Sequence, residues 1–285
     1  MKPARFEYHA PTSVDEAVQL LGTLAAEDGR ILAGGQSLVP TMAFRLAKPG
    51  HLIDINAIAA LEQIGTTDGA LAIGACVRHA AFHRPVVAGP LGQLMSTVVR
   101  HIAHYPIRQR GTFCGSLAHA DPASEWCLVA ATLGAEMVAL STRGARTIAA
   151  EDYFTGIMTT ALAEDELLAQ VRIPLLAPDT RFGFREFSRR AGDYAIAMAL
   201  VTFRLDRGTI LEPRVGVGGA EANARRIPQA ETALAGKPAE PATFRAAAEI
   251  AADVIEPMED VQADATYRRD LVRAMTRRAL EHAAQ

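Results

Sequence analysis

The chain has 285 residues, of which 49% are hydrophobic and 21% charged, and its formal net charge is -3. This composition is typical of a globular protein with a sizeable core, and the charge gives no electrostatic reason to bind nucleic acid or an anionic membrane. No apolar run is long enough to cross a bilayer, and the N-terminal residues lack the apolar centre of a signal peptide. We therefore expect a cytoplasmic protein without a transmembrane segment.

The first 57 residues predict a small α/β unit. Residues 13–26 place apolar side chains at helical spacing, and Ser13 and Glu16 are spaced as a capping box at the start of that helix. Short apolar strands follow at 31–33 and 51–55. This alternation favours parallel pairing of the strands.

The rest of the chain predicts two further units, at 58–178 and 179–285. In the second unit we expect strands at 71–73 and 167–173, a hairpin at 136–148, and helices at 77–87, 94–103 and 125–133. In the third we expect strands at 182–188, 196–205 and 214–218, then helices at 229–235, 242–254 and 264–283. Strands followed by helices indicate an α+β domain.

Two segments combine glycine with hydroxyl side chains. The first runs through Ala33, Gly34, Gly35, Gln36, Ser37 and Leu38, and the second through Thr112, Phe113, Cys114, Gly115 and Ser116. Neither is the usual dinucleotide fingerprint. A lone glycine pair after a strand is usually a tight turn. Two such segments favour loops whose backbone N–H groups approach one polyanionic ligand, such as a pyrophosphate.

Other polar residues suggest no catalytic or metal centre. Asp121 precedes a proline, so it reads either as a turn residue or as an acceptor for ligand hydroxyls. Tyr194 reads either as part of a charged turn or as a ring placed against a planar ligand. His101 and His104 lack a third metal ligand nearby, and the three cysteines are too few and too widely spaced for an iron–sulfur cluster. The residues alone thus predict a binder of a phosphate-bearing, ring-containing ligand.

The motifs together resemble the FAD-binding medium subunit of the molybdenum hydroxylases, the family of aerobic carbon monoxide dehydrogenase and xanthine dehydrogenase. The resemblance rests on AGGQSLVP at 33–40, IRQRGTFCGSLAHADPASE at 107–125 and SRRAGDYA at 188–195, with support from EDYFTGIMTTALAEDELL at 151–168. It covers essentially the full length. It implies an α+β fold: a two-subdomain FAD-binding fold of the vanillyl-alcohol-oxidase/p-cresol-methylhydroxylase type, plus a C-terminal α+β domain.

The resemblance also implies roles for residues. Ala33 to Leu38 would hold the pyrophosphate, and Thr112, Phe113, Cys114, Gly115 and Ser116 would contact the phosphates and the flavin. Asp121 would bind a ribityl or ribose hydroxyl, Tyr194 would lie beside the isoalloxazine, and Leu168 or its neighbour Leu167 would help close a ring pocket. The family commonly has Gly-Gly where this chain has Cys114-Gly115. No catalytic residue and no metal ligand is implied in this chain.

The resemblance finally implies partners. A large subunit would carry the molybdenum–pterin cofactor and a small subunit two [2Fe-2S] clusters, the three chains forming a dimer of heterotrimers. FAD in this chain would pass electrons to NAD, a quinone, a cytochrome or oxygen. The alternatives are a free-standing FAD-dependent reductase and a non-catalytic assembly subunit.

Overall fold

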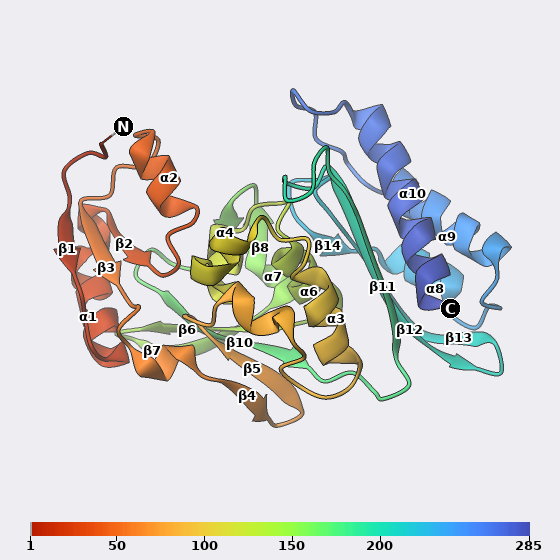
Figure 1. Cartoon of the computed structure of the whole chain (residues 1–285), viewed down its shortest axis with the longest axis horizontal. Coiled ribbons are helices and arrows are strands. Elements are labelled where there is room, and N and C mark those ends of the chain that lie inside the picture. Colours follow the sequence, from red (N-terminus) through yellow and green to blue (C-terminus); the bar gives the residue numbers. More distant parts are fainter. Residues whose placement is uncertain (1) are drawn as a thin grey trace.

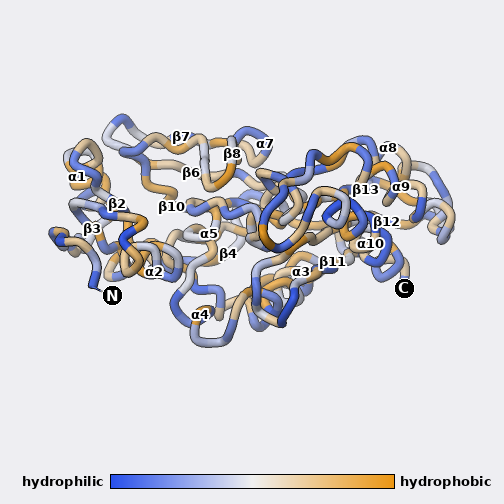
Figure 2. Tube along the Cα trace, turned by 90° about the horizontal axis from the view of Figure 1, so that it is seen from above, coloured by the Kyte–Doolittle hydropathy of each residue, from blue (hydrophilic) through white to orange (hydrophobic). Residues whose placement is uncertain are grey.

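A computed structural model describes residues 2–285 and contains three main β-sheets in chain order. Figure 1 shows the N-terminal sheet at one end, the C-terminal sheet and its helices at the other, and the five-stranded sheet between them. Figure 2, seen from above, shows the same order along the long axis. The middle sheet therefore has a neighbouring unit on either side.

The first sheet is parallel, with strand order β1-β3-β2. Its elements are β1 (Glu7–His9), α1 (Val14–Leu24), a 3-10 turn (Ala25–Glu27), β2 (Gly29–Leu32), α2 (Leu38–Ala43) and β3 (His51–Asp54). The Ser13 side chain accepts a hydrogen bond from the Glu16 backbone N–H and so begins α1 as expected. The predicted parallel unit is confirmed.

The second sheet is antiparallel, with strand order β4-β5-β10-β6-β7. Its strands are β4 (Ile64–Thr67), β5 (Ala70–Gly74), β6 (Glu136–Ser141), β7 (Gly144–Ala149) and β10 (Leu167–Pro174), with a small hairpin of β8 (Phe154–Gly156) and β9 (Thr159–Thr160). Its helices are α3 (Pro90–Val98), α4 (Tyr105–Arg110), α5 (Phe113–His119), α6 (Glu125–Leu133) and α7 (Ala150–Tyr153), with 3-10 turns at Ala59–Glu62 and His79–His83.

The C-terminal unit is a four-stranded antiparallel sheet followed by helices. Its elements are β11 (Arg181–Phe187), β12 (Ala197–Asp206), β13 (Thr209–Gly218), β14 (Arg225–Arg226), α8 (Pro228–Leu234), α9 (Pro241–Asp253) and α10 (Ala265–Ala283). The order of strands, then helices, is as predicted, but the first half of the third strand, from Thr209, and the short fourth strand were not predicted. Helix α6 of the middle unit contacts this sheet too, and every one of its residues is buried.

Two predicted helices of the middle unit are wrong in extent. Residues 77–87 form only the 3-10 turn His79–His83, because the backbone around Val77 pairs elsewhere: the Phe113 N–H donates to the Val77 carbonyl and the His79 N–H to the Gly111 carbonyl. The helix expected at 94–103 is α3, which begins at Pro90 and ends at Val98. The first difference arises from hydrogen bonds to residues distant in sequence. The earlier start of α3 arises from Pro90, which is well suited to the first position of a helix.

Apolar side chains form two cores. One is shared by the first two units and also takes in Phe184 and Leu200 of the C-terminal sheet, while the other lies wholly within the C-terminal unit. The unit boundaries after residues 57 and 178 stay predictions. Within residues 2–285, no helix combines the length and the apolar character needed to span a membrane.

Candidate functional site

A cleft of about 660 Å³ lies where the first sheet meets the middle unit. One wall is the end of β2 and the turn through Leu38, the second is α5 with its N-cap Thr112, and the third is the segment between Met158 and Glu166. The cleft thus opens at the carboxyl end of a parallel strand, where open α/β sheets commonly bind ligands. Its volume suits an organic cofactor.

The first wall is a turn that only glycine can form as observed. Gly35 has a φ of +70°, which disfavours other residues. A Cβ on Gly34 would lie 2.4 Å from the Arg110 carbonyl oxygen, so this turn touches the segment that leads into α5. The Asn56 amide donates to the Ala33 carbonyl at 2.8 Å and the Gln36 amide to the Gly34 carbonyl at 2.9 Å. These contacts fix the turn beside the cleft.

The second wall is a helix start rather than the predicted loop. Thr112 is the N-cap of α5, and its Oγ1 accepts from the Gly115 N–H at 3.1 Å. The hydrogen bond from the Ser116 N–H to the Thr112 carbonyl continues the helix. Thr112, Gly115 and Ser116 line the cleft. Thr112 is a typical N-cap residue, whereas Gly115 disfavours a helix interior, and together they predict a loop.

Phe113 and Cys114 point away from the cleft. Phe113 is buried against Phe82 and Trp126, with ring centroids 5.7 and 4.9 Å apart. The Cys114 thiol is buried 3.5 Å from the Ile73 carbonyl oxygen, and burial raises its pKa. The sulfur that replaces the family's usual glycine therefore occupies core space. Neither side chain lines the cleft, so any ligand contact from these residues would come from the backbone.

Asp121, Leu168 and Tyr194 also lie outside the cleft lining. Asp121 Oδ1 accepts from the Ala123 N–H at 2.9 Å, as a turn aspartate does. Leu168 is buried in β10. Tyr194 is 60% exposed, and partial desolvation together with the charges of Asp121 and Glu125 raises the pKa of its phenol. Asp121, two residues past the end of α5, is thus close enough to Tyr194 for its charge to act on the phenol.

The third wall was missed by sequence reasoning. It includes Met158, Thr159, Thr160, Leu162, Ala163, Glu164 and Glu166. The Glu166 carboxylate receives two hydrogen bonds from Arg146, both of 2.6 Å, and one from the Ala163 N–H at 2.8 Å. The hydrogen bonds from Arg146 contribute most to holding the pKa of Glu166 below its usual range. The site therefore includes a fixed, ionised carboxylate.

His79 is a second cleft residue that the sequence did not single out. It is buried, and its Nδ1 accepts from the Trp126 indole N–H at 3.0 Å. Burial, helped by the charges of Arg108 and Arg78, lowers the pKa of His79 to about 3. The imidazole is therefore neutral, with its proton on Nε2. No local sequence pattern marks this pair, because 47 positions separate its members.

Comparisons with known proteins agree with this architecture. Residues 4–176 match the family described as FAD binding domain in molybdopterin dehydrogenase, and residues 182–283 match the CO dehydrogenase flavoprotein C-terminal domain. The chain is 40% identical to the nicotine 6-hydroxylase medium subunit of Paenarthrobacter nicotinovorans, over 99% of both chains. It is 36% identical to the carbon monoxide dehydrogenase medium chain of Hydrogenophaga pseudoflava, over 99% of this chain and 98% of that one.

Solved structures show the same likeness. Carbon monoxide dehydrogenase from Hydrogenophaga pseudoflava matches with a TM-score of 0.95 and 38% identity, over 99% of this chain and 98% of that chain. Quinoline 2-oxidoreductase from Pseudomonas putida 86 matches with a TM-score of 0.93 and 37% identity, over 100% of this chain and 99% of that chain. The fold predicted from the motifs is confirmed.

Proposed function

The chain belongs to the FAD-binding medium subunits of the molybdenum hydroxylases, and from this membership we propose that the 660 Å³ cleft is where it holds FAD. The observation that carries the proposal is the glycine turn. At Gly34 and Gly35 the backbone lies at the cleft without a Cβ, and hydroxyls of Ser37, Thr112 and Ser116 share the lining. Such a surface can approach and hydrogen-bond a pyrophosphate.

The remaining walls fit the other parts of the cofactor. Glu166 is an acceptor-only group while it is ionised, so it suits hydroxyl or amine donors of the ligand and not its phosphates. Neutral His79 offers an N–H without adding positive charge. Asp121 follows the C-terminal end of α5 and its charge acts on the Tyr194 phenol, and we assign these two residues to a hydroxyl of the ligand and to the edge of the flavin ring.

The chain is an oxidoreductase subunit that works through its bound FAD. FAD supplies electron transfer in one- and two-electron steps, and this chain's residues bind it, orient it and shield it from water. The described part of the chain shows its three cysteines, Cys76, Cys114 and Cys127, as buried and free, and burial raises the pKa of each thiol. Such thiols are poor candidates to ligate iron, which suits a division of cofactors among subunits.

Its partners are the large and small subunits of a molybdenum hydroxylase, which carry the molybdenum–pterin cofactor and the iron–sulfur clusters. We further infer that electrons enter FAD from a cluster of the small subunit and leave to NAD, a quinone, a cytochrome or oxygen. The complex would be a dimer of heterotrimers. Neither the free-standing reductase nor the assembly subunit is favoured, since the relatives are medium chains over essentially their whole length. Cytoplasmic placement stays a prediction.

Affinity purification of the tagged chain from its own cells tests the proposal. We expect two further subunits, molybdenum and iron to co-purify, with one FAD per chain after acid release, and a mass that fits two heterotrimers. FAD without partners would favour a free-standing reductase. Partners without flavin would favour an assembly subunit and would contradict the assignment of the cleft.

A further inference from the structure

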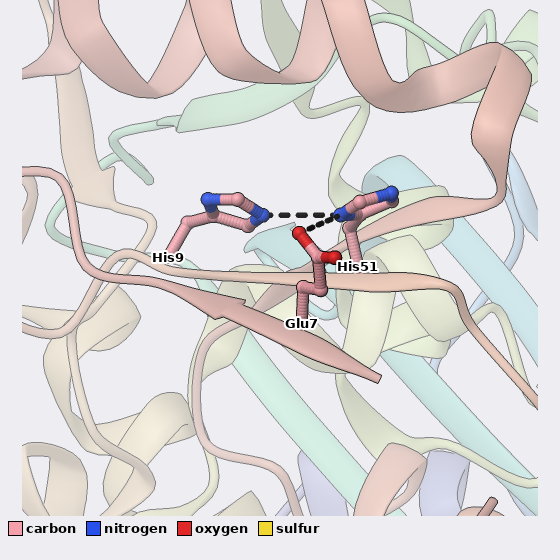
Figure 3. Close-up of side chains that lie close together, drawn as sticks. All are labelled: Glu7, His9 and His51. Atoms are coloured by element: carbon pink, nitrogen blue, oxygen red, sulfur yellow. Dashed lines mark hydrogen bonds and ion pairs between the residues drawn. The ribbon is translucent and has the colours of Figure 1, made fainter. Parts of the chain in front are cut away.

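We propose that β1 and β3 carry a binding site for a divalent transition-metal ion of the Zn²⁺ class, formed by Glu7, His9 and His51. In the parallel register of these strands Glu7 lies directly opposite His51. His9 is two residues further along β1, so its side chain leaves the same face of the sheet as that of Glu7. Figure 3 shows the two imidazoles and the carboxylate converging on one point.

The distances suit one ion. His9 Nε2 lies 3.1 Å from His51 Nδ1, and His51 Nδ1 lies 3.7 Å from Glu7 Oε2. The three ligand atoms all lie within 4.8 Å of one another. Tetrahedral zinc with bonds of about 2.0–2.2 Å separates its ligand atoms by about 3.3–3.6 Å. Two imidazole nitrogens and one carboxylate oxygen form a common zinc ligand set, with the fourth position left for water.

A second carboxylate orients His51 for this role. Glu27 Oε2 lies 3.5 Å from His51 Nε2, the ring nitrogen that does not face His9. This contact favours the proton on Nε2 and leaves the lone pair of Nδ1 free to bind a metal. A carboxylate behind a ligating histidine is the usual outer support of zinc sites. The His51 side chain is only 13% exposed, which restricts its orientation further.

Charge also favours a divalent cation. Glu7 and Glu27 contribute two carboxylates to the cluster, and each lies within 4 Å of a nitrogen of His51. Without an ion, the facing nitrogens of His9 and His51 must share a single proton. An ion would also join β1, a strand of three residues that pairs only with β3 in the described sheet, to its neighbour. Bound metal should therefore stabilise this edge against thermal unfolding.

Titration of the full chain with zinc, after removal of bound metals by a chelator, tests the site. Calorimetry should find one Zn²⁺ per chain, with a rise in melting temperature. His9→Ala should abolish this binding, and Glu7→Gln should weaken it at least tenfold. Glu27→Gln should weaken it about tenfold, as loss of an outer support does. His104→Ala, which removes an exposed histidine elsewhere, is the matched control and should bind like the parent.

Flavin content reports whether each variant is folded, because the cluster is separate from the cleft. Flavin content also distinguishes the metal site from the proposed FAD site. A variant that loses zinc binding but keeps its full flavin content has lost the metal site and not the FAD site. Absence of zinc binding by the flavin-loaded parent would overturn the proposal. So would a His9→Ala chain that binds zinc as tightly as the parent.

Discussion

Gly34→Ala should separate the two walls of the cleft and weaken FAD binding. The new Cβ would lie 2.4 Å from the Arg110 carbonyl oxygen and 2.6 Å from the Gly111 Cα, both backbone atoms that cannot rotate away. Because Cβ contacts below 3.0 Å are essentially never observed, one wall must move by at least 3.0 − 2.4 = 0.6 Å. Such a shift lengthens a hydrogen bond of about 2.9 Å to the limit of its range.

The loss of one hydrogen bond to a charged phosphate costs about 1.5–3 kcal/mol. Since about 1.4 kcal/mol corresponds to a tenfold change, the FAD dissociation constant should rise about 10- to 150-fold. Fluorescence titration of the apoprotein with FAD measures this constant. Gly65→Ala is the matched control, because nothing lies within 4 Å of its added Cβ and its φ is not positive. An FAD affinity within threefold of the parent in Gly34→Ala would refute the reasoning.

Three further changes test buried side chains. Glu186 lies in β11 with its side chain buried, and this burial raises the pKa of its carboxyl. The stability that the protonated group supports is therefore full at low pH and falls as pH rises above the usual glutamate value of about 4.3. Glu186→Gln should remove this fall and should gain about 1–3 kcal/mol of unfolding free energy at pH 8.5 and little at pH 5, measured by urea unfolding. Trp126→Phe removes the N–H that donates to His79 Nδ1, and it should cost about 1–3 kcal/mol of unfolding free energy and lower the flavin content. An unchanged free energy of unfolding would contradict the hydrogen bond between Trp126 and His79. Cys114→Ser should keep FAD affinity within twofold, because the thiol lies in the core; a tenfold loss at unchanged stability would place it at the cofactor.

Local sequence signals predicted much of the fold. Helix α6 begins and ends where the sequence indicated, because Gly134 adopts the left-handed conformation that ends it. The three C-terminal helices and the strands β11 and β12 lie within one residue of the predicted bounds, whereas only the second half of β13 was predicted. Residues 77–87 did not, because hydrogen bonds to Gly111 and Phe113 override their helical pattern. Pairing partners more than thirty positions away leave no local signal.

The candidate site was predicted only where a local sequence pattern marks it. The turn from Ala33 to Leu38 was found, since glycines after a strand are a local pattern. The wall around Glu166 was missed because the β8–β9 hairpin returns to the cleft only in the folded chain. Cys114 was expected to contact the ligand, yet the turn of α5 directs its side chain into the core. The direction of the Cys114 side chain depends on helix α5, where the sequence predicted a loop.

Electron entry into FAD is the most direct test of the proposed electron-transfer role of this chain. The FAD-loaded chain would be mixed rapidly with the co-purified small iron–sulfur subunit, previously reduced, while flavin and cluster absorbance are followed separately. If this chain is the electron-transfer subunit, flavin absorbance should fall as the clusters are oxidised. Oxidised flavin that persists in a formed complex with reduced clusters would contradict the role of this chain as the electron-transfer subunit.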